Sequence, residues 1–217
     1  MFIPLERSFF EPSAKVVAPL LLGHWLVRQT PAGPCVGVIV ETEAYLDGDP
    51  ACHAYGGETA RNRAMWGAPG RAYVYLIYGF HYCFNTVCCP SGKAEAVLVR
   101  AVEPHLGLEL MRANRPVSED VHLTSGPGKL CAAMNIDRSL DGADLCDAAS
   151  PVFVAENPCR EQFLKKRGPM MTTPRIGLSR AADLPLRFFL RESPFVSRKA
   201  PVETRAGRGR RKPAAKP

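Results

Sequence analysis

The sequence lacks any run of about 18 apolar residues, which excludes a transmembrane helix. Its start, MFIPLERSFFEPSAK, lacks the basic leader, apolar stretch and small-residue cleavage site of an export signal. The eight cysteines form no CxxC pair and the five histidines show no H-x₃₋₅-H spacing, so zinc-ribbon and zinc-finger patterns are absent. We therefore expect a cytoplasmic protein without membrane contact, metal or cofactor, whose cysteines are reduced and structural. A disulfide framework is the alternative.

Residues 1–197 also lack a net charge. The chain holds 28 Lys/Arg and 21 Asp/Glu, and residues 198–217 take eight of the former and one of the latter, which leaves 20 of each. This segment, RKAPVETRAGRGRRKPAAKP, is rich in Pro, Gly and Ala without apolar periodicity, which predicts a disordered basic tail after one domain over 1–197. Such a tail suits the phosphates of nucleic acid, although a tail that only solubilises fits its composition nearly as well.

The periodicity of the domain predicts a mixed α+β fold with a curved, largely antiparallel sheet flanked by helices. Two strands with a Pro/Gly turn fill 26–46, and a protruding hairpin fills 71–88. We expect a further strand at 94–104 and three short late strands in PVFVAE, PRIGL and PLRFFLR. Helices are predicted over 12–25, with a break or irregular start near Pro19, and over 105–115 and 124–136, with a short helix or turn at 60–70.

The strand VIVETEAYL (38–46) places carboxylates beside an aromatic residue. Alternation puts Ile39, Glu41, Glu43 and Tyr45 on one side of the strand, and Val38, Val40 and Thr42 on the core side. A single acid on a strand is usually a surface residue. Polar and aromatic residues near in sequence favour a pocket instead, in which a glutamate could act as a general base on water: Tyr45, His53, Tyr75, Tyr78, Asn85 and Arg100.

Aromatic residues are only 8% of the chain, yet six of the 18 lie within residues 73–84. The hairpin VYLIYGFHYCFN (74–85) turns at Tyr78-Gly79, where Asn, Asp or Gly is normal. Tyr78 cannot pack inward at a tip, and neither can Phe80 and His81. A protruding apolar wedge with Arg61 and Arg63 just upstream is typical of proteins that part stacked bases in the minor groove. Lys129, after SGPG, could add a phosphate contact.

Several motifs in consistent order carry a family resemblance. VETEAYL, ACHAYGGETARNRAMWGAPGRAYVYLIYGFHYCFN, AVLVRAVEP, SGPGKLC, RIGL and PLRF resemble the alkyladenine (3-methyladenine) DNA glycosylase family over about residues 8–197. The chain is similar to compact bacterial members, and the resemblance implies a monomer that acts on double-stranded DNA containing damaged purines.

The resemblance also implies roles for individual residues. Glu43 matches the general base that activates water, Arg100 a basic residue near that water, and Leu178 a valine that positions the water through its main chain. Tyr45, His53 and Tyr75 match the walls around a flipped-out base, and Asn85 matches the residue that rejects guanine. Tyr78 matches the wedge that fills the gap in the duplex.

These roles imply a monofunctional DNA glycosylase of base excision repair, associated with the nucleoid through DNA. It would hydrolyse the N-glycosidic bond of alkylated purines, with deaminated purines as a second substrate class left open. One carboxylate suffices because an alkylated purine is already cationic and needs no acid to leave. The alternatives are a non-enzymatic module that binds distorted DNA, and a nucleoside hydrolase or formyltransferase-like domain, which would not explain Tyr78 or the tail.

Overall fold

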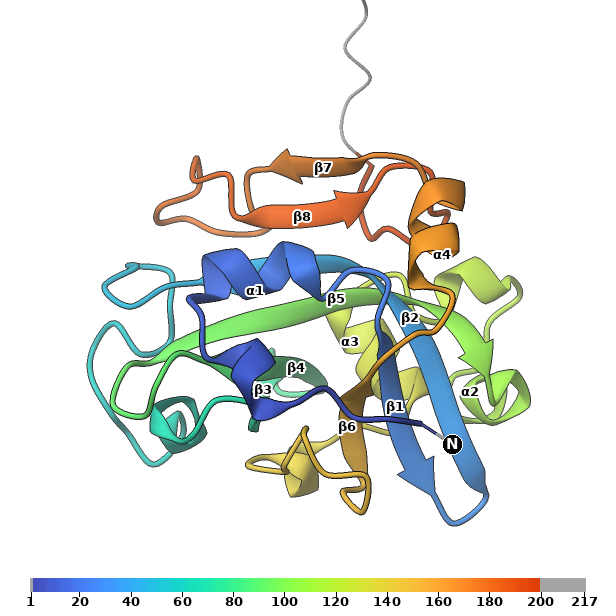
Figure 1. Cartoon of the computed structure of the whole chain (residues 1–217), viewed down its shortest axis with the longest axis horizontal. Coiled ribbons are helices and arrows are strands. Elements are labelled where there is room, and N and C mark those ends of the chain that lie inside the picture. Colours follow the sequence, from blue (N-terminus) through green and yellow to red (C-terminus); the bar gives the residue numbers. More distant parts are fainter. Residues whose placement is uncertain (1, 200–217) are drawn as a thin grey trace, which may run out of the picture.

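An eight-stranded sheet forms the centre of the fold in the computed structural model, which describes residues 2–199 (Figure 1). Six strands lie in the order β3 (Ala72–Ile77), β4 (His81–Cys88), β5 (Glu95–Leu106), β2 (Gly33–Tyr45), β1 (Trp25–Thr30) and β6 (Val152–Ala155). Strand β8 (Arg187–Leu190) pairs with both β2 and β7 (Met170–Thr173). All strand pairs within 2–199 are antiparallel, so the predicted α+β class and antiparallel sheet are confirmed.

Four short α-helices accompany the sheet in the described part of the chain: α1 (Ala14–Leu20), α2 (Leu108–Asn114), α3 (Pro127–Ala133) and α4 (Arg160–Lys166). Single turns of 3₁₀-helix occupy Arg7–Phe10, Arg63–Trp66, Asp120–His122 and Arg138–Leu140. Helix α1 begins after Ser13, whose hydroxyl accepts from the Lys15 amide, and ends one residue after Pro19. Pro19 lies inside the last turn of this helix, and its missing N–H weakens the turn. The helix predicted over 12–25 is therefore too long, because it ends at Leu20 and Trp25 already begins β1.

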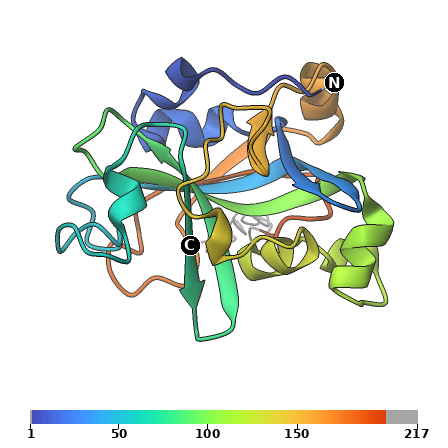
Figure 2. The same cartoon turned by 90° about the horizontal axis from the view of Figure 1, so that it is seen from below.

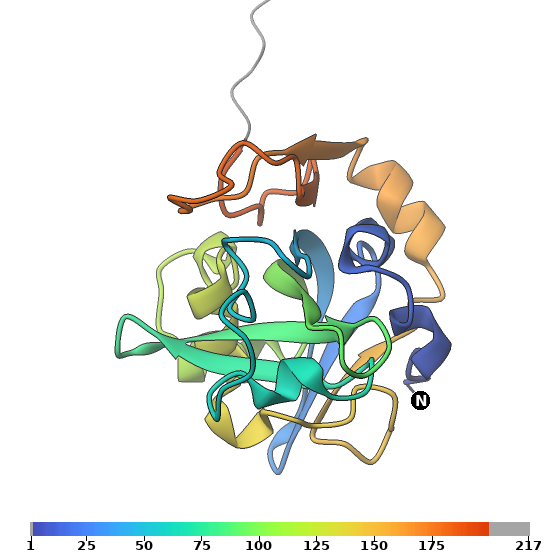
Figure 3. The ribbon, with the colours of Figure 1, turned by 90° about the vertical axis from the view of Figure 1, so that its left-hand side faces the viewer.

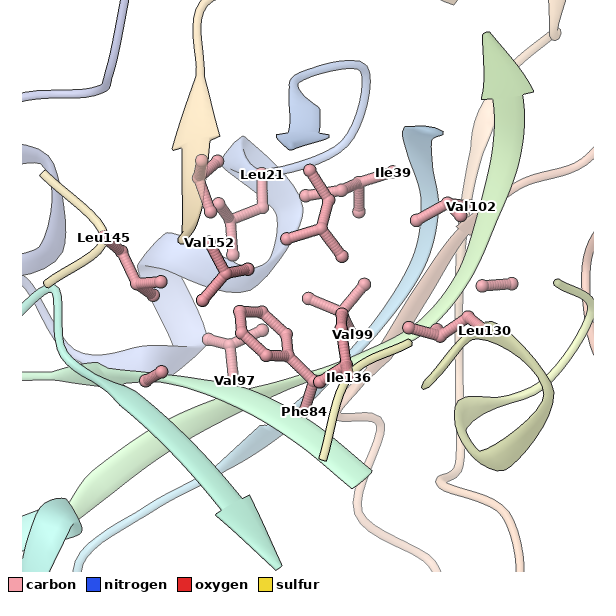
Figure 4. Packing of buried hydrophobic residues seen from close by; sticks show 14 of the residues in the cluster. Leu21, Ile39, Phe84, Val97, Val99, Val102, Leu130, Ile136, Leu145 and Val152 are labelled. Carbon is pink, nitrogen blue, oxygen red and sulfur yellow. The ribbon is translucent and has the colours of Figure 1, made fainter. Parts of the chain in front are cut away.

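Strands β3, β4 and β5 carry a separate apolar cluster on each of their two faces. Alternate residues of β3, β4 and β5 belong to the main core, which also includes α1 and α3; Figure 4 shows Phe84, Val97 and Val99 within it. The residues between them, such as Tyr75, Cys83 and Leu98, form a smaller cluster on the opposite face. This second face is therefore free to line a site while the first holds the fold together.

Strand β2 contains an irregularity that corrects one prediction. Opposite β5, Ile39 pairs with Val102 but Glu41 pairs with Ala101, so Val40 is an extra residue. Because of this bulge, Ile39 and Val40 both enter the main core. The prediction that Ile39 shares a side with Glu41 was wrong, because alternation assumes a regular strand. Nearby, β2 and β5 approach so closely that a Cβ at Gly37 would lie 2.5 Å from Val102, which requires glycine there.

One of the three strands predicted in the last third of the chain is absent from the structure, which describes residues 2–199. PRIGL (174–178) is not a strand; β7 lies just before it, and α4 was not predicted. Pro174 cannot donate to a sheet ladder, and Arg175 is buried with its side chain bonded to Asp49 rather than standing on a sheet face. The strands predicted in PVFVAE and PLRFFLR are confirmed as β6 and β8.

The β3–β4 hairpin extends well beyond the rest of the sheet (Figures 2 and 3). At its tip Tyr78 and Gly79 have φ of 54° and 79°, and the Phe80 amide donates to the Ile77 carbonyl over 3.4 Å. Two successive positive φ angles are the pattern of a type I′ turn, which favours Asn or Gly. Tyr78 is 77% exposed and Phe80 is 70% exposed. The predicted aromatic tip is confirmed, and Tyr78 holds a backbone conformation that bulky residues rarely adopt.

Residues 2–199 include all eight cysteines but almost none of the predicted basic tail. The predicted basic tail lies outside the described residues, apart from Arg198 and Lys199. All eight cysteines are free and six are buried, in agreement with reduced, structural thiols rather than a disulfide framework. Over residues 2–199, no helix is both long enough and apolar enough to cross a membrane.

Candidate functional site

A cavity of about 330 Å³ opens on the second face of the sheet. Loop 47–57, the hairpin, β5, the SGPG turn and the segment after Pro174 together supply its walls. Its lining includes most residues that the sequence singled out: Tyr45, His53, Tyr75, Tyr78, His81, Asn85, Arg100 and Leu178. Segments as distant in sequence as residues 45 and 178 thus meet at one concave site, of a size typical of small-molecule pockets.

Glu43 lies just behind this lining and is fully buried. Its Oε2 accepts from the Tyr45 hydroxyl at 3.0 Å and from Arg100 Nη1 at 3.2 Å. Its Oε1 accepts from the Ile176 amide at 2.7 Å. All three donors belong to residues that line the cavity, so Glu43 is held in one orientation at the cavity floor. Burial, with Glu43 close by, raises the pKa of Tyr45, which keeps its phenol protonated as a donor.

Glu41, two residues earlier, has a different role. Its carboxylate accepts from Arg100 Nε at 3.0 Å, from Arg187 Nε at 2.7 Å, and from the amide and hydroxyl of Ser197 at 2.6 and 2.8 Å. Three of these donors share Oε1 and one binds Oε2, so Glu41 has four protein donors where Glu43 has three, and two of the four come from Ser197, which does not line the cavity. Burial opposes the charge of Arg100, but Glu43 and Glu41 outweigh it and raise the pKa of Arg100, so the guanidinium stays charged.

His53 and Asn85 are both fixed by Tyr73. The Tyr73 hydroxyl lies 2.9 Å from His53 Nδ1, and the Asn85 amide donates to the Tyr73 carbonyl at 3.0 Å. Burial, helped by the charge of Arg61, lowers the pKa of His53, so the imidazole is neutral near pH 7. Its ring packs against Tyr75 with 4.3 Å between centroids. The sequence analysis did not predict Tyr73 as a site residue. Its position two residues before Tyr75 puts both on the same face of the strand, and this could have indicated that it lies at the site.

The remaining predicted DNA contacts lie around the hairpin. Arg61 donates to the Leu76 carbonyl at 3.0 Å and lies over the Tyr75 ring, so it braces the hairpin. Arg63 is largely exposed beside Glu58, with 3.4 Å between charged atoms. Lys129 Nζ lies 3.4 Å from the Ser125 hydroxyl. The rings of Phe80 and His81 pack together at the tip, 4.3 Å apart. Only His81 of these also lines the cavity.

Sequence reasoning missed an ion pair at the edge of the site. Arg175 Nη2 donates to Asp49 Oδ1 at 3.1 Å, a second contact joins Nη1 to Oδ2, and Nη1 also donates to the Ala44 carbonyl at 2.9 Å. The two residues are 126 positions apart in the sequence, so no local sequence pattern predicts that they pair. Within residues 2–199, no three His, Cys, Asp or Glu side chains gather as a metal site would require.

Comparison with known proteins assigns the family. The family model described as Methylpurine-DNA glycosylase matches residues 8–194. The chain belongs to the methylpurine-DNA glycosylase family. It is 48% identical over 195 residues to a protein of Methanoculleus marisnigri and 43% identical over 195 residues to one of Carboxydothermus hydrogenoformans, covering 90% of this chain and 99% of each relative. A Rhodopseudomonas palustris protein is 47% identical over 194 residues, or 89% and 90% of the two chains. Each is named "Putative 3-methyladenine DNA glycosylase".

Membership confirms the resemblance drawn from the motifs. A methylpurine-DNA glycosylase is a hydrolase of N-glycosyl bonds that acts in DNA repair, so the prediction of an enzyme is confirmed over that of a non-catalytic DNA-binding module. The matched residues include the strand of Glu43, the hairpin and the segment around Leu178.

Proposed function

We propose that this methylpurine-DNA glycosylase flips a methylated purine, such as 3-methyladenine, out of the duplex and into the cavity. There Glu43 activates a water molecule that displaces the base from C1′ of its sugar. The observation that carries the proposal is the fixed carboxylate of Glu43 behind a pocket with aromatic walls. A carboxylate has about four acceptor positions, and three protein donors use three of them, which leaves one position on Oε1 for a water.

The chemistry follows from the residue types. Water attacks C1′ of the nucleotide and gives its proton to Glu43, the N-glycosidic bond breaks, and its electron pair leaves with the base. A methylated purine is cationic and becomes neutral as it leaves, so no second acid is required. The sugar develops positive charge, which the Glu43 carboxylate stabilises. Arg100 orients that carboxylate, and Leu178, two residues after the Ile176 amide, offers its main chain to the water.

The walls of the pocket fit a cationic base. The faces of Tyr45 and Tyr75 are electron-rich and attract a cation, while neutral His53 does not repel it. Asn85, fixed against the Tyr73 carbonyl, would crowd the exocyclic amino group of guanine and so reject that base. No lysine lines the cavity among the residues described, which supports hydrolysis without a Schiff-base lyase step. Action as a monomer on nucleoid DNA remains a prediction from the sequence.

The hairpin supports capture of the flipped nucleotide. Tyr78 projects from its tip and also reaches the edge of the cavity, so a ring inserted into the duplex would fill the space that the base has left. Arg63, Phe80, His81 and Lys129 would contact the backbone or groove beside it, while Arg61 holds the hairpin in place.

A strand-scission assay tests this function. We expect the enzyme to act on a duplex with a single methylated purine, so that the strand breaks at that site only after alkali. Breakage before alkali would contradict a monofunctional mechanism, and an intact strand after alkali would contradict excision. A parallel duplex with hypoxanthine tests whether deaminated purines are a second substrate class.

Truncation separates the tail from the site. A chain that ends at Lys199 keeps the Ser197 contacts to Glu41 and loses six Lys/Arg. With saturating enzyme, we expect this truncated chain to excise methylpurines at the rate of the full chain. Its plot of log binding constant against log salt concentration should be less steep by up to about five. A chain that ends at Phe195 lacks Ser197, one of the three residues that bind Glu41, and should lose most activity. Equal salt slopes for the full chain and the Lys199 truncation would make the tail a bystander.

A further inference from the structure

Arg175 connects three segments that build the pocket. Its side chain is fully buried and bonded to Asp49 in loop 47–57, which carries His53, and to the Ala44 carbonyl next to Tyr45. The following residues, Ile176 and Leu178, line the cavity. The guanidinium also lies over the Tyr45 ring, 4.6 Å from its centroid.

The Tyr45 ring separates this guanidinium from the cavity. Tyr45 lines the cavity, whereas neither Arg175 nor Asp49 does, so one face of the ring is covered by Arg175 and the other is left for the base. Aromatic rings attract cations on either face, but two cations on opposite faces of one ring repel each other. Burial makes that repulsion stronger than it would be in water.

Asp49 removes this conflict. Its side chain is 2% exposed and meets the guanidinium through both carboxylate oxygens, so the pair has no net charge behind the Tyr45 ring. Arg175 can therefore hold three segments together without opposing a cationic base on the far face of the ring. A neutral residue in place of Asp49 would leave a full positive charge there.

We propose that the Asp49 carboxylate is a specificity-determining group, which permits cationic methylpurines to bind by cancelling the Arg175 charge behind Tyr45. The inference rests on the proposed function, in which the flipped base stacks on Tyr45. It assigns the pair a role in selecting substrates by charge, beyond joining loop 47–57 to the segment after Pro174.

Charge variants in a non-cleaving background test the proposal. In Glu43→Gln protein, the dissociation constant of a duplex with 3-methyladenine is divided by that of the same duplex with a tetrahydrofuran abasic analogue, which has no base to place in the pocket. We expect Asp49→Asn to raise this ratio about tenfold and Arg175→Gln to lower it, because the residual charges have opposite signs. The double variant Asp49→Asn/Arg175→Gln has no charge at the pair and should return to within about threefold of the parent.

The opposite signs distinguish charge selection from a purely structural role. An unchanged ratio in Asp49→Asn, or shifts in the same direction in both single variants, would overturn the inference. Thermal melting shows which variants fold; if Asp49→Asn does not, the lowered ratio in Arg175→Gln and its return in the double variant carry the test, and their absence overturns the inference. If the parent binds the 3-methyladenine duplex no better than undamaged duplex, base capture itself is wrong, and the inference falls with it.

Discussion

Replacement of Glu43 with glutamine is expected to slow base release by about 10²- to 10⁴-fold, the usual contribution of a general base. Glutamine keeps the size of the side chain, and its single carbonyl oxygen can accept either from Tyr45 and Arg100 or from the Ile176 amide, but it cannot take a proton from water. The measurement is single-turnover release of a labelled methylpurine with enough enzyme to saturate the duplex.

A matched control is available on the neighbouring strand. Glu103 is, like Glu43, an ion-paired glutamate, although it is partly rather than fully buried; it is held by Arg167 and the Ser193 hydroxyl and does not line the cavity. Glu103→Gln should change the release rate by no more than about twofold, since a general base accelerates only the bond it serves. Equal losses in both variants would show that Glu43 acts through the fold rather than through the reaction.

The second large effect is expected at Tyr78, where stability and function should change in opposite directions. Asparagine tolerates positive φ better than tyrosine, so Tyr78→Asn should raise the free energy of unfolding by about 1 kcal/mol. Loss of the ring should weaken binding to lesion or abasic duplex by roughly 5- to 150-fold, since stacking on one base is worth about 1–3 kcal/mol. Binding to single strands should change much less. Denaturant unfolding and titration of the three DNAs measure these effects.

Phe80 supplies the comparison for Tyr78. It is a similarly exposed aromatic residue two positions later, without positive φ. Phe80→Asn should therefore give no gain in stability and a smaller loss of duplex affinity. If Tyr78→Asn weakens single-strand and duplex binding equally, Tyr78 does not act as a wedge.

The sequence predicted those parts of the site whose signals are local. Tyr75 and Asn85 lie on the strands of the hairpin and were among the predicted pocket residues, and a tyrosine where a turn favours Asn or Gly marked Tyr78. Tyr73 and Cys83, on the same face, were not predicted. The motifs of the family placed Glu43, Arg100 and Leu178, which periodicity alone could not have brought together.

The missed features depend on contacts between distant segments. The bulge at Val40 arises from the pairing of β2 with β5, and neither strand shows it alone. The Asp49–Arg175 pair joins residues 126 apart, and PRIGL was taken for a strand because its apolar residues resemble one. Its real role is to place the Ile176 amide on Glu43, which becomes visible only in three dimensions.

Chemical rescue of a Glu43→Ala variant tests most directly whether the Glu43 carboxylate is the general base. Glu43→Ala leaves space at the cavity floor, into which a small acid such as formate can diffuse. Single-turnover release of methylpurine should be almost undetectable without formate and should rise with formate concentration, because the missing base is restored without the residue. Release by Glu43→Ala at close to the unmodified rate in the absence of formate would contradict the account.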